Sequence, residues 1–275
     1  MAKYRLGCCI PGASFMPEGV SGVSPAPYDV LRRGTDVILS HGFDYAEAGV
    51  GMIMKLSDAE LAAAVNSRIE IEACNSFIPF EYKIVRDGSS DVGSPLYEYV
   101  RRALERLSAL GIKIVVFGSG GARRIPDGMS IADGRTYILR FLSMCAALSA
   151  EYDLSIAIEP LRALECNAIN YLDDAISLVV AANDSHITYL ADAFHMCHGG
   201  EPADALTRVS IMPSHIHIAE APDRTCPGSR GGEYLTAFAQ ALHRTPYAAR
   251  VSVECGFEDF DRECGLAYDF ASRLY

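Results

Sequence analysis

Residues 155–160 read Ser-Ile-Ala-Ile-Glu-Pro, a short apolar run that ends on a carboxylate. Three later runs end on a carboxylate or an imidazole: Leu-Ala-Asp at 190–192, His-Ile-His at 215–217 and Val-Ser-Val-Glu at 251–254. Short apolar runs rich in β-branched residues are typical of buried strands. The sequence therefore predicts four successive strands, each of which delivers a carboxylate or an imidazole at one end.

The same kind of run recurs through the rest of the chain. The candidate strands are residues 4–10, 45–49, 69–74, 113–117, 155–159, 188–192, 215–219 and 251–254. The amphipathic stretches between them predict helices. One begins with a capping box at Ser57–Glu60, and another covers residues 96–110 and ends before Gly111. The stretch 28–41 is a weaker candidate because Gly34 interrupts it.

Eight strands that alternate with helices predict a parallel sheet. In 275 residues the economical closure is an α/β fold of the (β/α)8 TIM-barrel type, with residues 1–275 forming a single domain. The rival is an open doubly wound sheet. That fold would show a glycine-rich turn directly after the first strand, and Gly-Cys-Cys-Ile-Pro-Gly at 7–12 is a poor version of one.

Composition limits the partners and the compartment. The 24 basic and 35 acidic residues give a net charge of −11, which argues against nucleic acid and anionic membranes as partners. No apolar run is long enough for a membrane span, and the N-terminus lacks the form of a signal peptide. The nine cysteines include no CxxC pair, so we expect neither a disulfide framework nor a zinc knuckle. A cytoplasmic protein is the default expectation.

The polar residues at the strand ends predict a metal site. In a barrel of this type chemistry takes place at the carboxyl ends of the strands, where Glu159, Asp192, His217 and Glu254 would converge. Three carboxylates in one barrel mouth repel each other, and a divalent cation would offset that repulsion. A set of mainly oxygen ligands suits Mn²⁺, Mg²⁺ or Co²⁺, and Zn²⁺ remains possible.

Further polar residues lie at fixed distances from these four. Glu165 comes six residues after Glu159, and His195 comes three residues after Asp192. His215 alternates with His217, so both side chains point to the same side of their strand.

The order Ile-Glu-Pro, Asp-x-x-His, His-x-His and a final Val-Glu resembles the xylose isomerase-like TIM barrels. Within them it is most similar to the sugar phosphate isomerase/epimerase branch that contains the ketose 3-epimerases, and the resemblance covers nearly the whole chain. It implies one divalent metal ion per chain, and Mn²⁺ is the ion that we expect first. Its ligands would be Glu159, Asp192, His217 and Glu254.

The resemblance also implies substrate contacts and a mechanism. Glu165, His195 and Arg224 would touch a small-molecule sugar or sugar phosphate. The metal would bind the carbonyl and a neighbouring hydroxyl oxygen of a ketose and stabilise an enediolate. Glu159 and Glu254 would remove and return the proton from opposite faces of the carbon. Transfer between neighbouring carbons would instead give an aldose–ketose isomerase.

Three other segments would line the substrate pocket. The glycine-rich segment 118–121 precedes two arginines, of which we favour Arg124 for an inward position where it could bind a phosphate or carboxylate. Asn75 and Glu47 follow or lie within earlier strands, and Glu47 could alternatively form a buried ion pair. The chain has no Trp, so an aromatic platform for a sugar would come from Phe77, Phe117, Phe194 or a tyrosine.

Other functions share this scaffold. A lyase, a dehydratase or a C-glycoside-cleaving enzyme could use the same metal and bases, since the fold does not determine the reaction. The apurinic-site endonuclease branch needs a cluster of zinc ions and a basic groove, and seven His with a net charge of −11 argue against it. A non-catalytic sugar-binding barrel would have no reason to keep all four ligands. The relatives implied by the resemblance are commonly dimers or tetramers, which makes a homodimer or homotetramer the expected assembly.

Overall fold

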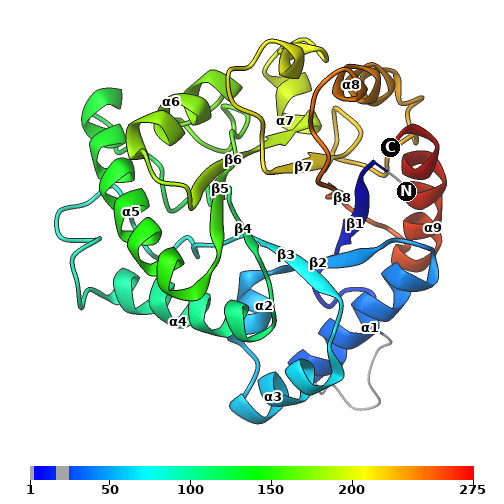
Figure 1. Ribbon diagram of the computed structural model, residues 1–275, viewed down its shortest axis with the longest axis horizontal. Helices are drawn as coiled ribbons and strands as arrows, with labels where there is room; N and C mark the ends of the chain where they lie inside the picture. The colour runs from blue at the N-terminus through cyan, green and yellow to red at the C-terminus, as the bar shows by residue number, and fades with distance from the viewer. Residues whose placement is uncertain (1–2, 17–24) are drawn as a thin grey trace.

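The eight short apolar runs become eight parallel strands that close into a barrel in the order β1 to β8. The structure is a computed structural model that describes residues 3–16 and 25–275. The strands are β1 (Arg5–Cys9), β2 (Tyr45–Gly49), β3 (Ile71–Asn75), β4 (Ile114–Phe117), β5 (Ser155–Ile158), β6 (Ile187–Asp192), β7 (His215–Ile218) and β8 (Arg250–Val253). Figure 1 looks down the barrel, with the strands in the middle and the helices around them. The predicted (β/α)8 barrel is confirmed, and each strand begins and ends within two residues of its predicted limits.

Helices connect consecutive strands and cover the outside of the barrel (Figure 1). They are α1 (Pro27–Ser40), α2 (Val50–Met54), α3 (Asp58–Ser67), α4 (Pro95–Ala109), α5 (Ile131–Tyr152), α6 (Leu172–Ala182), α7 (Ala193–His198), α8 (Glu233–His243) and α9 (Phe260–Leu274), with a short 3₁₀ helix η1 (Ala205–Thr207). The predicted capping box starts α3, where Ser57 and Glu60 satisfy each other's backbone N–H groups. None of the helices in the described ranges is both long and apolar enough to cross a bilayer.

Helix α1 forms in full, although Gly34 made this stretch the weakest predicted helix. Gly34 is buried, and a Cβ atom built at this position would lie 2.6 Å from Cγ2 of Ile10. The glycine therefore allows α1 to pack closely on the end of the first strand, and this tertiary contact outweighs its low helix propensity.

The interior of the barrel has an apolar floor beneath a polar layer. The floor consists of Tyr45, Ala73, Ile114, Val116, Ala157 and Leu190, all buried. Tyr45 lies against β1, because a Cβ atom on Gly7 would lie 2.2 Å from its ring, and its hydroxyl group is 2.8 Å from Oγ of Ser252. Inward-facing residues alternate along a strand, so Glu47 lies one layer nearer the mouth than Tyr45. The floor thus supports the polar groups above it.

We predict that Gly7→Ala destabilises the protein, because the new methyl group would displace the ring of Tyr45 from the barrel floor. Overpacking of this kind costs about 1–3 kcal/mol. Thermal unfolding would show it as a lower Tm. Gly51→Ala in α2 is the matched control, since a Cβ there meets no atom within 4 Å. Equal Tm values for the two variants would contradict this description of the floor.

Candidate metal centre and active site

The four predicted metal ligands converge at the carboxyl ends of four neighbouring strands. Glu159 directly follows β5, Asp192 ends β6, His217 lies within β7 and Glu254 directly follows β8. One donor atom from each lies within 4.8 Å of the donor atoms of the other three. Asp192 and His217 are direct partners in the β6–β7 pairing, so strand register alone brings these two together.

The donor atoms of this group fit a divalent cation. Oε1 of Glu159 and Nδ1 of His217 are buried and make no hydrogen bond of ordinary geometry. Nδ1 of His217 nevertheless lies 2.9 Å from Oε2 of Glu254 and 3.6 Å from Oε1 of Glu159. One imidazole nitrogen and three carboxylates form a mainly oxygen site that suits Mn²⁺, Mg²⁺ or Co²⁺ and is compatible with Zn²⁺.

Burial and neighbouring charges push the pKa values of the three carboxyl groups apart. Burial, together with the charge of Glu254, raises the pKa of Glu159. Burial alone would also raise the pKa of Glu254, but Arg224 and His217 outweigh it and lower that pKa. For Asp192, Arg224 and the two nearby histidines overcome burial and lower the pKa to about 2. Asp192 and Glu254 are therefore held as anions, as metal ligands must be.

Arg224, which the resemblance implied as a substrate contact, lies among these carboxylates. The loop after β7 folds back through a pairing of Glu220 with Thr225, and Arg224 adopts a left-handed φ of 55° there. Its Nη2 donates to Oε2 of Glu254 and, at 3.0 Å, to Oδ2 of Asp192, while its Nε donates to the carbonyl of Glu254 at 3.1 Å. Its positive charge thus offsets part of the acidic cluster.

A cavity of about 390 Å³ opens above these residues. Its polar lining includes Glu159, Glu165, His195, Arg224 and Glu254, and its apolar wall includes Ile78, Pro79, Phe80 and Leu161. The three substrate contacts implied by the resemblance, Glu165, His195 and Arg224, therefore lie in the same cavity as two of the predicted metal ligands, Glu159 and Glu254. The three phenylalanines expected to face the sugar, Phe77, Phe117 and Phe194, are fully buried and do not line the cavity. Phe80 lies in the cavity wall instead and is 75% exposed.

His195 is in contact with more donors than it can satisfy. Its Nδ1 accepts the backbone N–H of Arg162 at 3.2 Å, and its Nε2 lies 3.0 Å from Nη1 of Arg224. A neutral imidazole carries one N–H and offers one acceptor nitrogen, so it cannot accept both hydrogen bonds. Only one of these two contacts can be an ordinary hydrogen bond, and the contact with Arg224 is the one whose partners both line the cavity.

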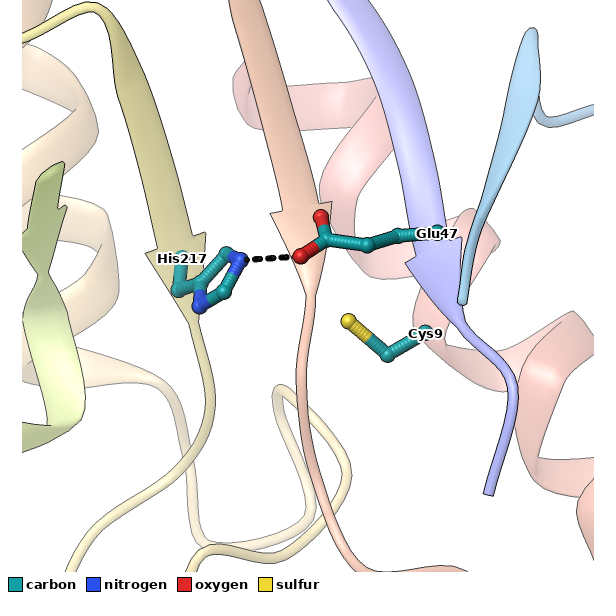
Figure 2. A group of neighbouring side chains, drawn as sticks. All are labelled: Cys9, Glu47 and His217. Carbon is teal, nitrogen blue, oxygen red and sulfur yellow. Dashed lines mark hydrogen bonds and ion pairs between the residues drawn. The ribbon is translucent and has the colours of Figure 1, made fainter. Parts of the chain in front are cut away.

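Asn75 and Glu47 do not line the cavity, contrary to expectation. They contact the predicted metal ligands Glu254 and His217 instead. Nδ2 of Asn75 donates to Oε1 of Glu254 at 3.0 Å. Glu47 is fully buried, and its two oxygens lie 2.8 Å from Nε2 of His215 and 2.9 Å from Nε2 of His217. Figure 2 shows Glu47 on β2 pointing toward His217 on β7. For Glu47 the structure thus shows the alternative that the sequence left open, a buried ion pair.

Arg124 is not where the sequence led us to expect it. Its side chain is exposed and takes no part in the cavity, whereas Arg123 is fully buried. Nη1 of Arg123 donates to the carbonyl of Phe117 at 2.8 Å, and Nη2 donates to the carbonyl of Glu159 at 2.6 Å. The preference for Arg124 is therefore corrected: the inward arginine is its neighbour Arg123, which binds the backbone carbonyl of the predicted metal ligand Glu159 and does not line the cavity. Two adjacent arginines after a glycine-rich turn carry no sequence signal for which of them turns inward.

Comparison with known proteins agrees with this architecture. Residues 36–271 match the sequence model of the xylose isomerase-like TIM barrel family. The chain belongs to this family. This xylose isomerase-like barrel is 27% identical over 121 residues to the D-psicose 3-epimerase of Enterocloster bolteae (strain ATCC BAA-613), a match that spans 44% of this chain and 40% of that protein.

Solved structures of other barrels match almost the whole chain. The 3-keto-D-glucoside 4-epimerase YcjR of E. coli superposes with a TM-score of 0.78 at 21% identity, covering 98% of this chain and 99% of that one. The IolI protein, whose structure holds a zinc atom, superposes with a TM-score of 0.75 at 18% identity and the same coverage. At these identities the likeness establishes the shared fold.

We predict that Arg123→Met destabilises the protein, since it removes the donor to the buried carbonyl of Glu159 and one of the two donors to the carbonyl of Phe117, which keeps the N–H of Glu159 at 3.2 Å. One unpaired buried acceptor costs about 1–3 kcal/mol in the free energy of unfolding. Urea unfolding would measure the loss, with Arg124→Met as the neighbouring control that should leave stability unchanged. A larger loss of unfolding free energy in Arg124→Met than in Arg123→Met would contradict the burial of Arg123.

Proposed function

We propose that this chain is a divalent-metal-dependent sugar epimerase or isomerase that transfers a proton at the carbon beside the carbonyl of a ketose. The observation that carries the proposal is the convergence of Glu159 and Glu254 on one buried imidazole, beside a cavity of about 390 Å³. That volume falls within the range of small-molecule sites. The similarity to a D-psicose 3-epimerase and to a 3-keto-D-glucoside 4-epimerase supports the same class of reaction.

The proposed metal, Mn²⁺ in the first instance, would be held by Glu159, Asp192, His217 and Glu254. When bound it would supply Lewis acidity to the oxygens of the substrate and so acidify the neighbouring C–H group. Glu159 and Glu254 both line the cavity. One of them would remove the proton from the substrate, and the other would return a proton to it. Delivery from the far side of the same carbon inverts it, and delivery to the neighbouring carbon interconverts a ketose and an aldose.

Glu165, His195 and Arg224 would hold the sugar. Each lines the cavity, and Arg224 can exchange its contact with His195 for a hydroxyl oxygen of the substrate. The half-exposed carboxylate of Glu165 would accept from a second hydroxyl group, while its other contact is Nε of Arg162 at 2.6 Å. Phe80 would cover an apolar face of the sugar ring.

The charges in the cavity favour an uncharged sugar over a sugar phosphate. Its lining carries three carboxylates, on Glu159, Glu165 and Glu254, and the guanidinium of Arg224 already pairs with Glu254 and Asp192. Among the described residues of the lining, no other Lys or Arg offers a positive charge. The proposed divalent cation and Arg224 together would balance the charges of Glu159, Asp192 and Glu254, which leaves no spare positive charge for the roughly two negative charges of a phosphate. We therefore propose a neutral ketose as substrate.

Proton exchange in D₂O would test the proposal. Incubated with Mn²⁺ and a panel of ketoses and ketose phosphates, the protein should introduce deuterium beside the carbonyl of at least one neutral ketose. Ketose phosphates should exchange more slowly, because their charge is repelled by the lining. NMR would name the carbon that exchanges. Exchange limited to phosphorylated sugars would overturn the assignment of a neutral substrate.

Variants at the two bases complete this test. Glu159→Gln and Glu254→Gln should each lower the exchange rate by at least about 10²–10⁴-fold, the usual contribution of a positioned acid or base. Glu201→Gln is the matched control, because this partly buried carboxyl group lies outside the cavity and, within residues 3–16 and 25–275, accepts a hydrogen bond from the N–H of Leu172 alone. Full exchange in either base variant would remove the two-carboxylate mechanism.

A further inference from the structure

The carboxylate of Glu47 lies between two histidines in the closed interior of the barrel. Oε2 is 2.8 Å from Nε2 of His215, and Oε1 is 2.9 Å from Nε2 of His217. All three side chains have no exposed surface. Figure 2 shows Glu47 pointing straight at the ring edge of His217 from across the barrel. Each oxygen of the carboxylate thus has one imidazole of its own.

These contacts determine which nitrogen of His217 faces the metal centre. An ionised carboxylate only accepts hydrogen bonds, so the nitrogens that face it must carry protons. Both Nε2 atoms lie within 2.9 Å of an oxygen of Glu47, which is the distance of an ordinary N–H···O hydrogen bond. With Nε2 of His217 committed to Glu47, its Nδ1 is left to face Glu254 at 2.9 Å and Glu159 at 3.6 Å.

We propose that Glu47 is a positioning residue of the metal centre: clamped by His215, it fixes the ring and the Nε2 proton of His217 so that Nδ1 is the ligand atom. The negative charge of Glu47 also makes Nδ1 a stronger donor to a cation, as carboxylate partners of metal-bound histidines do. This inference depends on the proposed function only in its use of the four-ligand metal site.

Cys9 offers a competing use of the same groups. Its Sγ, an oxygen of Glu47 and a nitrogen of His217 lie within 4.8 Å of one another, and Figure 2 shows the sulfur close to the other two. A thiophilic ion could in principle bind there through Nε2. However, the contact between Glu47 and His217 has hydrogen-bond length, and Sγ of Cys9 accepts from Nδ2 of Asn75 at 3.3 Å. We therefore assign Nε2 to Glu47 and Nδ1 to the metal.

Nitrogen NMR on the wild-type protein tests the assignment without any substitution. The chain has seven His, so ¹⁵N-histidine labelling gives a simple spectrum. On addition of Zn²⁺, Nδ1 of His217 should shift while Nε2 keeps a slowly exchanging proton. A His217 ring with its proton on Nδ1 and its metal-dependent shift on Nε2 would overturn the proposal.

Metal affinity tests the energetic role of Glu47. Glu47→Gln preserves the shape but removes the charge and offers one acceptor where the carboxylate offers two. We expect its Kd for Mn²⁺, measured by titration calorimetry, to rise roughly 10–100-fold, with much of kcat recovered at saturating Mn²⁺. Glu201→Gln should bind Mn²⁺ like the wild type. An unchanged Kd in a folded Glu47→Gln variant would overturn the positioning role.

Two further outcomes separate this inference from its alternatives. Co²⁺ titration should show no thiolate-to-metal charge-transfer band, and a band that Cys9→Ser abolishes would place the metal on Nε2 and contradict the proposal. If the wild type binds Mn²⁺ and exchanges no proton on any ketose, the proposed function fails. The Mn²⁺ Kd of Glu47→Gln still decides the role of Glu47 in that case.

Discussion

The electrostatic repulsion among three carboxylates around one buried imidazole is the constraint on which the arrangement at the mouth of the barrel depends. Glu159, Asp192 and Glu254 are close enough for their charges to repel, and they are largely removed from water. Such a group is stable only with compensating charge and hydrogen bonds. Arg224 supplies part of that charge directly, and a divalent cation at this point would supply the rest.

The barrel provides the supporting contacts from several strands at once. Asn75 at the end of β3 donates to the carboxylate of Glu254, and Arg123 after β4 binds the carbonyl of Glu159. Glu47 on β2 holds His217 from the opposite wall. Each predicted ligand thus has a hydrogen-bond partner on another element, which restricts its orientation. The apolar floor around Tyr45 closes the barrel beneath them and excludes water from that side.

Much of this arrangement follows from local sequence pattern. Apolar, β-branched runs predict the strands, and a carboxylate at the end of such a run predicts the ligands, because parallel strands present their carboxyl ends together. Alternation along β7 correctly predicts that His215 and His217 share one side, since both contact Glu47. These inferences need only the period of a strand and the closure of the barrel.

Other features depend on packing that no local pattern contains. Glu47 meets a residue 170 positions away across the barrel, so its support of His217 is invisible along the chain. The inward turn of Arg123 instead of Arg124 follows a turn in which Ser119 has a φ of 39°. Phe77 packs against Phe141 of α5, whereas Phe80 lies in the cavity wall. The conformation of the loop after β3 determines which of the two faces the cavity.

The central claim is that four side chains from successive strands form one cation site. Anomalous diffraction at the manganese edge, from crystals grown with Mn²⁺, tests it most directly. The account predicts a single strong peak about 2.0–2.3 Å from Glu159, Asp192, Glu254 and Nδ1 of His217. A manganese ion bound elsewhere, or no peak among these four residues at saturating Mn²⁺, would contradict it.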